Sequence, residues 1–221
     1  MPQARITRPH QRRTKADNGQ KVYNRCLRAS RTAMFSFLFV SLANHIGFAQ
    51  PFGIAEGTPT DKLMVLKELA PFAYFITPKN SHPDIESYSV ISTPEHGVCA
   101  VLGYGFTLNN DAYGTRVRDV FKKITGQLSD KYGNSKSYDF LNFGSIWNDP
   151  KYWAMSLHKN ERHYSRFWDK EEKSTLQNGI ESIALSANSL GSDSTYIVIR
   201  FEYDNIAKCR AKMESVGSGA L

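Results

Sequence analysis

The stretch ESYSVISTPEHGVCAVLGY, residues 86–104, holds two strand-like runs around a short turn. In its first half, Tyr88, Val90 and Ser92 recur at every second position, which is the period of a strand with one buried face. Residues 94–97, PEHG, have the composition of a turn. Residues 98–104 then return as a second, largely apolar run. Strands joined by so short a turn run antiparallel, so this hairpin predicts an antiparallel sheet.

The flanking sequence extends this hairpin on both sides. Further strands are predicted at residues 72–77, 138–143, 180–190 and 196–204. Helices are predicted at residues 59–70, 117–132 and 149–168, and from residue 206 onward. A doubly wound α/β fold would need helices between most strands, and this order lacks them. The sequence therefore predicts an α+β fold of two layers, with a mainly antiparallel sheet and helices packed on one face.

The helix at residues 117–132 has the clearest pattern in the chain. One narrow stripe at helical spacing holds its apolar side chains, which are Val117, Val120, Phe121, Ile124, Leu128 and Tyr132. Off that stripe lie charged side chains, among them Arg116, Arg118, Lys122, Lys123 and Asp130. Gly133 is suited to end the helix. This pattern predicts one apolar face that packs on the sheet.

The charge of the chain is concentrated at one end. The 221 residues carry a formal net charge of +7, from 28 basic and 21 acidic residues. Nine of the basic residues and one of the acidic residues precede residue 50, which leaves 19 basic and 20 acidic residues in the remainder. The remainder therefore has no global charge that would attract a polyanion, and a nucleic-acid partner is not expected.

The first 49 residues have the three parts of a secretion signal in the expected order. A basic stretch runs to Arg31, the apolar run AMFSFLFVSLA covers residues 33–43, and small residues stand at Gly47 and Ala49. We expect cleavage between Ala49 and Gln50, a single domain at 50–221, and a disordered tail from about residue 216. Because a helix needs roughly 20 apolar residues to span a bilayer, a transmembrane anchor is not expected.

The compartment follows from the same leader. We expect a periplasmic or secreted protein. The chain has no Asn-x-Ser/Thr acceptor for N-glycosylation, which favours a bacterial source. Of its three cysteines, Cys26 would be lost with the leader. In an oxidising compartment, the remaining Cys99 and Cys209 are predicted to form a disulfide.

Catalytic signatures are missing from the sequence. It contains no HExxH, G-x-S-x-G, G-x-x-x-x-G-K or CxxC motif, so we assign no catalytic residue, no cofactor and no metal ligand. A metal site would require the fold to place His82 or His96 beside a carboxylate such as Asp84 or Glu95. No spacing in the sequence requires this.

The stretch SIWNDPKYWAMSLHKNERHYSRFWD, residues 145–169, holds all three tryptophans. On a helix its large apolar side chains would share one stripe, which comprises Trp153, Leu157, Tyr164 and Trp168. The opposite side would gather four basic residues, Lys151, Lys159, Arg162 and Arg166. These four residues are either an ordinary solvated face or a docking face for an anionic partner, such as a lipid surface, a cell-wall polymer or an acidic protein.

Several short motifs resemble a group of uncharacterised exported bacterial proteins. They are Pro51-Phe52-Gly53-Ile54 with Gly57, Tyr132-Gly133, Gly144-Ser145-Ile146-Trp147, Glu161-Arg162, Phe201 and Cys209. The resemblance covers most of residues 51–210. It implies export and a single domain, and that group has no assigned activity to carry over.

The leading functional hypothesis is a non-enzymatic exported module that binds an anionic envelope component or a protein partner. Two alternatives stay open. One is an envelope hydrolase whose site no sequence pattern reveals, and the other is a secreted inhibitor or immunity-type protein. A deep pocket with titratable groups of shifted pKa would favour the hydrolase, whereas a surface with one conspicuous patch would favour binding.

Overall fold

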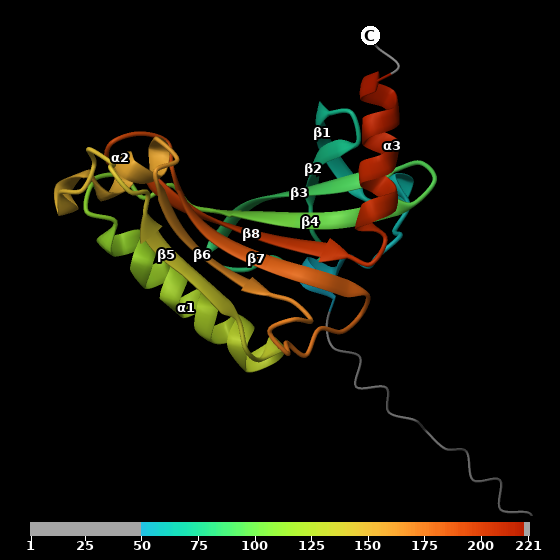
Figure 1. Cartoon of the computed structure of the whole chain (residues 1–221). Helices are drawn as coiled ribbons and strands as arrows, with labels where there is room; N and C mark the ends of the chain where they lie inside the picture. The colour runs from blue at the N-terminus through green and yellow to red at the C-terminus, as the bar shows by residue number, and fades with distance from the viewer. Residues whose placement is uncertain (1–49, 219–221) are drawn as a thin grey trace, which may run out of the picture. The chain divides into compact units, whose positions relative to one another are not determined.

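A computed structural model describes residues 50–218 of the chain. Eight strands form one antiparallel sheet, in the order β1-β2-β3-β4-β8-β7-β6-β5 (Figure 1). They are β1 (Met64–Ala70), β2 (Ala73–Thr77), β3 (Ile85–Thr93), β4 (Gly97–Gly105), β5 (Lys136–Leu141), β6 (Arg162–Trp168), β7 (Ile180–Ser189) and β8 (Thr195–Tyr203). The α-helices are α1 (Thr115–Tyr132), α2 (Trp153–His158) and α3 (Ile206–Ser218). Short 3₁₀ turns are η1 (Pro51–Gly53), η2 (Thr60–Lys62) and η3 (Pro150–Tyr152). The predicted α+β class with an antiparallel sheet is confirmed. The prediction that the helices pack on one face differs from the structure, because α1 and α3 cover opposite faces.

The sheet consists of two halves that follow each other in the sequence. Strands β1–β4 form the first half and β5–β8 the second, and within each half every strand pairs with the next one along the chain. The two halves are joined by the pairing of β4 with β8, in which Val101 lies opposite Phe201. Strands β1 and β5 are the two edges of the sheet.

Helix α1 covers one face of the sheet. The predicted stripe is buried at Val117, Phe121, Ile124, Leu128 and Tyr132. It packs on β7 and β8, whose buried side chains alternate along each strand. The core there is built from Ile183, Leu185, Ile197, Ile199 and Phe201. The helix that follows the first half of the sheet is therefore anchored on strands of the second half.

Helix α3 packs against β3 and β4 from the other face. Ala100 and Leu102 point to that face, because they alternate with Val101, which belongs to the core under α1. Cys99 of β4 and Cys209 of α3 are fully buried and disulfide-bonded, with Cα atoms 6.4 Å apart, as predicted. The helix that follows the second half is thus anchored on the first half.

Two predicted helices are wrong. Residues 64–70 form the edge strand β1 and not a helix, because they pair with β2; all seven of their side chains are exposed. The predicted helix at residues 149–168 ends at His158, and residues 162–168 form β6. That strand hydrogen-bonds to β5 on one side and to β7 on the other. Backbone pairing of β6 with a strand on each side outweighs the helical spacing of apolar residues on which the prediction rested.

The predicted secretion signal lies outside the described residues, and Gln50 is the first residue that the structure describes. At the other end, α3 extends to Ser218 and so includes the start of the expected tail, whereas residues 219–221 lie outside the described part. Within residues 50–218, no helix is long and apolar enough to cross a membrane.

Candidate binding groove between α1 and the β5 edge

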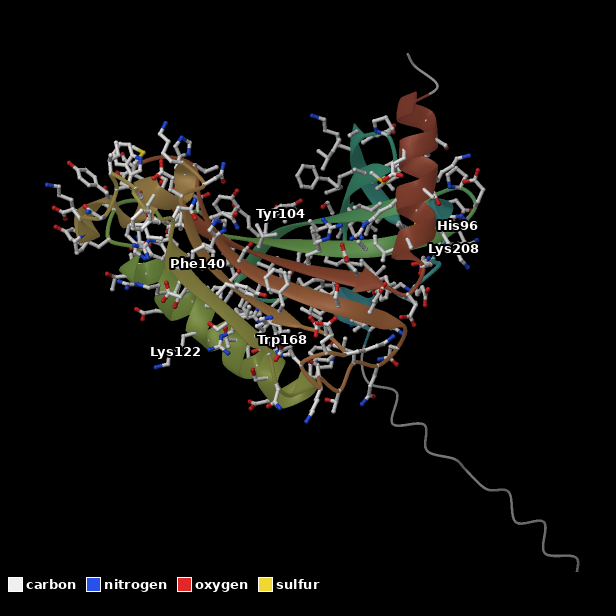
Figure 2. The ribbon with its side chains drawn as sticks, in the orientation of Figure 1. His96, Tyr104, Lys122, Phe140, Trp168 and Lys208 are labelled. Atoms are coloured by element: carbon white, nitrogen blue, oxygen red, sulfur yellow. A yellow bond between two sulfur atoms is a disulfide. The ribbon has the colours of Figure 1, made fainter. Side chains whose placement is uncertain are left out.

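A groove opens on the α1 side of the sheet, between α1 and the strands β5 and β6. Its volume is about 400 Å³. Its basic side chains are Arg118 and Lys122 of α1 and Arg166 of β6, and its acidic ones are Asp119 and Asp139. We call this cavity, defined by Arg118, Lys122 and Arg166, the basic groove. Figure 2 labels Lys122 on α1, beside the β5–β6 end of the sheet.

Trp153 holds two guanidinium groups next to the basic groove. The guanidinium carbon of Arg118 lies 5.4 Å from the centroid of the indole ring, and that of Arg162 lies 5.7 Å from it. Trp153 is only 6% exposed, so its ring is a fixed support. A guanidinium on an aromatic face is stabilised by about 0.5–2 kcal/mol, depending on its desolvation. The contacts therefore hold two positive charges on one ring.

The first turn of α1 fixes the position of Arg118. Its Nε donates to the carbonyl oxygen of Gly114 at 3.1 Å, and its Nη2 donates to that of Tyr113 at 3.2 Å. Gly114 has a φ of +66°, and a Cβ atom there would overlap the ring of Trp153. Glycine is thus required both for the backbone conformation and for the approach of the indole ring. The same residue positions the helix, the ring and the arginine.

Arg162 is the more enclosed of the two arginines, with 18% of its side chain exposed. Its Nε donates to Oγ of the buried Ser156 at 3.0 Å, and its Nη1 lies 3.7 Å from a carboxylate oxygen of Asp139. Burial lowers the pKa of Arg162, the nearby Asp139 raises it, and Arg118 lowers it further. An arginine nevertheless stays protonated at neutral pH. The repulsion between Arg118 and Arg162 is therefore an electrostatic cost that a bound anion would reduce.

Tyr164 adds a hydroxyl group to the basic groove. Its ring packs against Phe121 and Trp153, with centroids 4.6 Å and 5.6 Å away. Burial raises the pKa of Tyr164, so the phenol stays protonated at neutral pH and can donate a hydrogen bond. Guanidinium groups offer paired donors that match the oxygens of carboxylates and phosphates. The groove thus combines donors and positive charge suited to an anion.

The four predicted basic residues do not share one helix face. Lys151 lies in η3, where its Nζ is 3.4 Å from the carboxylate of Asp149, and Lys159 follows the end of α2. Arg162 and Arg166 lie in β6, two strand periods apart, so both side chains are on the α1 side of the sheet. The structure therefore places Arg166 in the lining of the groove and Arg162 beside it on Trp153, and leaves the two lysines outside the lining.

Sequence reasoning missed Arg118 and Lys122 as site residues. Both were visible as basic side chains off the apolar stripe of the predicted helix, four residues apart and hence on one side of it. Their neighbour Lys123 has a different role, because its Nζ pairs with Asp84 at 2.7 Å. Only the packing of α1 beside β5 and β6 shows which of these cations reach the groove.

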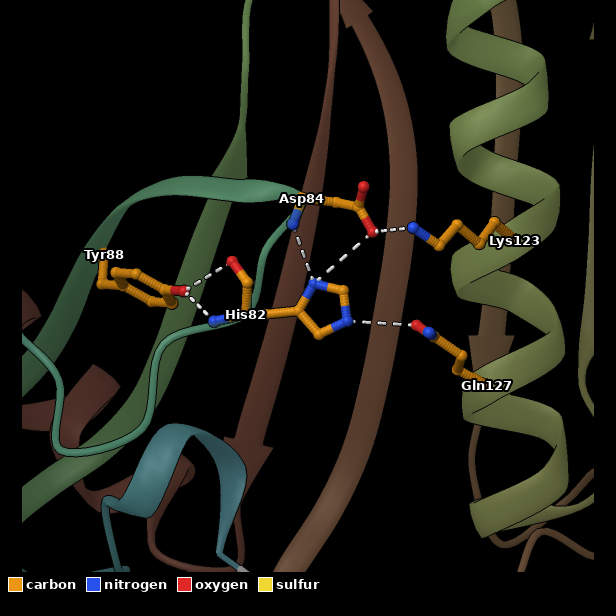
Figure 3. Close-up of polar contacts among 5 residues, drawn as sticks. All are labelled: His82, Asp84, Tyr88, Lys123 and Gln127. Carbon is orange, nitrogen blue, oxygen red and sulfur yellow. Dashed lines mark hydrogen bonds and ion pairs between the residues drawn. The ribbon is translucent and has the colours of Figure 1, made fainter.

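A second polar cluster ties the loop after β2 to α1 (Figure 3). His82 lies beside Asp84, with Nδ1 3.7 Å from the carboxylate, and its Nε2 is 3.1 Å from Oε1 of Gln127. The same carboxylate oxygen of Asp84 pairs with Nζ of Lys123 at 2.7 Å. Among residues 50–218, no group of three or more metal-ligating side chains occurs. The cluster links the loop to the helix through hydrogen bonds and ion pairs.

Comparison with known proteins adds no relative. The chain matches no protein-family model, no curated protein and no solved structure. The basic groove is therefore interpreted from its own chemistry.

Proposed function

We propose that this chain is a non-enzymatic binding module, exported by a bacterium to its periplasm or its surroundings, which holds an anionic partner in the basic groove. One observation carries the proposal: Arg118 and Arg162 are oriented on the same indole ring, and the nearest carboxylate to Arg162 is 3.7 Å away. Such an arrangement leaves positive charge available to a partner.

Preorganisation supports binding as the role of these residues. An arginine on a free surface loses about 0.5–1.5 kcal/mol of side-chain entropy when a partner immobilises it. Here Arg118 already donates to two backbone carbonyl groups and Arg162 to Ser156, so most of that cost is met on folding. Apart from Nη1 of Arg162, which lies near Asp139, the remaining donors of both groups can contact carboxylate or phosphate oxygens.

The composition of the groove favours binding over catalysis. Its arginine and lysine side chains carry positive charge, and arginine offers paired donors that match carboxylate and phosphate oxygens. Burial raises the pKa of Tyr164, so its phenol stays protonated at neutral pH. A general acid or base must gain or lose a proton near the working pH, and burial holds Tyr164 away from that range. These side chains act as fixed donors.

Export is supported by the leader pattern and by the disulfide, because disulfides persist in oxidising compartments. The measurement is the intact mass of the protein purified from its native host. We expect a product that begins at Gln50. A full-length product in the cytoplasm would overturn this part of the proposal.

The basic groove can be tested with two matched charge reversals. One variant carries Arg118→Glu and Arg166→Glu, in the groove; the other carries Lys151→Glu and Lys159→Glu, outside it. Both change the net charge equally. We expect the wild-type protein to bind immobilised poly-L-glutamate with an affinity that falls as salt is added. The groove variant should lose roughly tenfold or more in affinity, which corresponds to about 1.4 kcal/mol.

The control variant should keep its affinity to within about twofold, since isolated surface charges outside the groove lining contribute little. Circular dichroism melting curves establish that both variants are folded. Equal losses in the two variants would mean that only net charge matters, and would refute the groove as a site.

A further inference from the structure

The edge strand β5 differs from the edge strand at the other end of the sheet. β1 has two register irregularities in its pairing with β2, between Val65 and Lys67 and between Glu68 and Ala70. β5 pairs with β6 in an unbroken register from Lys136 to Leu141. Bulges are a usual way to prevent an edge from accepting another strand. β1 has this protection, and β5 keeps the regular geometry that an added strand needs.

The backbone of β5 has hydrogen-bonding groups on its outer side. Asn142 donates its N–H to the carbonyl of Glu161, the residue opposite it, at 2.7 Å. In an antiparallel pair the residues that face the partner strand alternate, so the N–H and C=O groups of Ser137, Asp139 and Leu141 point away from β6. Within residues 50–218, no backbone hydrogen bond joins these three residues to a segment on the outer side.

Two grooves of opposite charge flank this edge. The basic groove lies on the α1 side. On the other side of the sheet is a cavity of about 380 Å³, which we call the aromatic groove; it is lined by Lys136, Tyr138, Phe140, His163, Ser165, Phe167, Asp169, Glu171 and Glu172. Tyr138 and Ser165 line both cavities, so the two grooves lie on either side of the same part of β5. Figure 2 labels Phe140 on this strand.

The aromatic groove already contains a cation on an aromatic ring. Nζ of Lys136 lies 5.5 Å from the ring centroid of Tyr138. Hydrogen bonding and charge interaction with Tyr138, followed by the nearby Glu172, raise the pKa of Lys136. Further along the strand, the ring of Phe140 is 47% exposed and stacks on His163 at 4.7 Å. The surroundings of this groove therefore suit basic and aromatic side chains.

We propose that β5 accepts an extended peptide segment of a partner protein as an added antiparallel strand, with acidic side chains in the basic groove and basic or aromatic side chains in the aromatic groove. Adjacent side chains of a strand point to opposite faces, so a segment that alternates in this way fills both grooves at once. The outer backbone groups of Ser137, Asp139 and Leu141 supply the main-chain hydrogen bonds, as in other cases of strand addition. This inference rests on the proposed function and specifies the partner of the same groove.

A second copy of this chain fits the edge less well than a foreign strand. A continuous sheet made by two β5 strands has its two-fold axis perpendicular to the sheet. That symmetry keeps each face on its own side, so it places the basic groove of one copy next to the basic groove of the other. The acidic side chains around the two aromatic grooves would likewise meet each other. Like charges in such positions are destabilising, whereas a segment of alternating charge complements both grooves.

The test uses synthetic peptides and the purified protein. The peptide Ac-KETEYEKE-NH2 alternates glutamate with basic, polar and aromatic residues, and Ac-KTYKEEEE-NH2 has the same composition without alternation. We expect the alternating peptide to bind roughly tenfold or more tightly, a difference of about 1.4 kcal/mol. Hydrogen exchange should show new protection at the amides of Ser137, Asp139 and Leu141 when it binds.

Backbone methylation separates strand addition from charge attraction. In the added strand, the residues whose side chains enter the basic groove also direct their N–H groups to β5. N-methylation of the glutamates should therefore abolish binding, whereas the same number of N-methyl groups on the intervening residues should be tolerated. Equal binding of both methylated peptides, or of the two unmethylated ones, would refute strand addition and leave the anion-binding proposal intact. If the wild-type protein bound neither poly-L-glutamate nor any of the peptides, both the anion-binding proposal and strand addition would be refuted. Concentration-dependent dimerisation without peptide binding would identify a second copy of the chain as the occupant of the β5 edge.

Discussion

Gly114 and Trp153 are in direct contact: a Cβ atom on Gly114 would overlap the six-membered part of the indole ring. The φ of +66° at Gly114 also costs an L-residue about 1–2 kcal/mol. We therefore expect Gly114→Ala to lower the free energy of unfolding by at least about 2 kcal/mol, since the strain and the overlap add. Urea denaturation measures this loss.

Gly126 is the matched control, because it lies in the same helix and a Cβ atom there would meet nothing within 4 Å. Gly126→Ala should raise the free energy of unfolding by roughly 0.5–1 kcal/mol through the higher helix propensity of alanine. If Gly114→Ala proved neutral or stabilising, the described contact between Gly114 and Trp153 would be incorrect.

Trp153 and Trp168 are both buried, yet they should differ in their effect on binding. Trp168 is fully buried and donates from Nε1 to the carbonyl of Gly133 at 3.1 Å. Trp168→Ala should lower stability by about 3–5 kcal/mol, as is usual for a large core aromatic. Trp153→Leu should cost less stability but should weaken poly-L-glutamate binding, because Arg118 and Arg162 lose their common support. Melting curves and binding isotherms of both variants, measured under conditions where each is folded, test this division.

Most of the secondary structure could be predicted from local patterns. The stripe of α1 and the hairpin of β3 and β4 have the periods of a helix and a strand, and both were predicted close to their observed bounds. In β6 the two periods conflict. Tyr164 and Trp168 are four residues apart, which suits a helix, but both also point to one side of a strand. Pairing with β5 and β7 decides that these residues form a strand and not a helix. Both strands are separated from β6 by long connections, so local sequence does not reveal the pairing.

The basic groove could be predicted only in part. Arg162 and Arg166 were singled out, although on a helix face that does not exist. The pairing of Arg118 with Arg162 depends on Trp153, and no spacing in the sequence brings these three residues together. The disulfide is the opposite case. With Cys99 and Cys209 as the two cysteines after the predicted leader, composition alone was sufficient to predict their pairing.

The Cys99–Cys209 disulfide should contribute strongly to stability. The two cysteines are 110 residues apart in the sequence. Chain entropy alone would make such a cross-link worth up to roughly 4–5 kcal/mol, although measured values are often smaller. We expect reductant to lower the melting temperature of the wild-type protein. The double variant Cys99→Ala/Cys209→Ala should melt at the temperature of the reduced wild-type protein, with or without reductant. A wild-type melting temperature that did not change on adding reductant would contradict the prediction.

Alkaline pH should destabilise the fold through its buried phenols. Burial raises the pKa of Tyr132 to about 12, and burial also raises the pKa of Tyr203. The folded state therefore keeps protons that the unfolded chain releases near pH 10, so the stabilisation is complete below about pH 10 and is lost as the pH rises toward 12. The expected slope is up to about 1.4 kcal/mol per pH unit for each tyrosine.

Tyr132→Phe is the control for this pH dependence. It removes the ionisable group, so the free energy of unfolding should decline less steeply above pH 10 than in the wild-type protein. Urea denaturation at a series of pH values measures both slopes. Identical slopes in the two proteins would show that Tyr132 titrates normally in the folded state.

Each half of the sheet is covered by the helix that follows the other half in the sequence, and this has a consequence for biosynthesis. When a ribosome has completed β1–β4 and α1, the inner edge of β4 has no neighbour, because it pairs with β8. The apolar stripe of α1 has no surface to cover either, because it packs on β7 and β8. A nascent or truncated chain that ends before Tyr203 therefore presents an open edge and an apolar helix face at once. Chaperones bind such surfaces, and aggregation begins on them. Both surfaces are covered only once β8, the last strand, has been made.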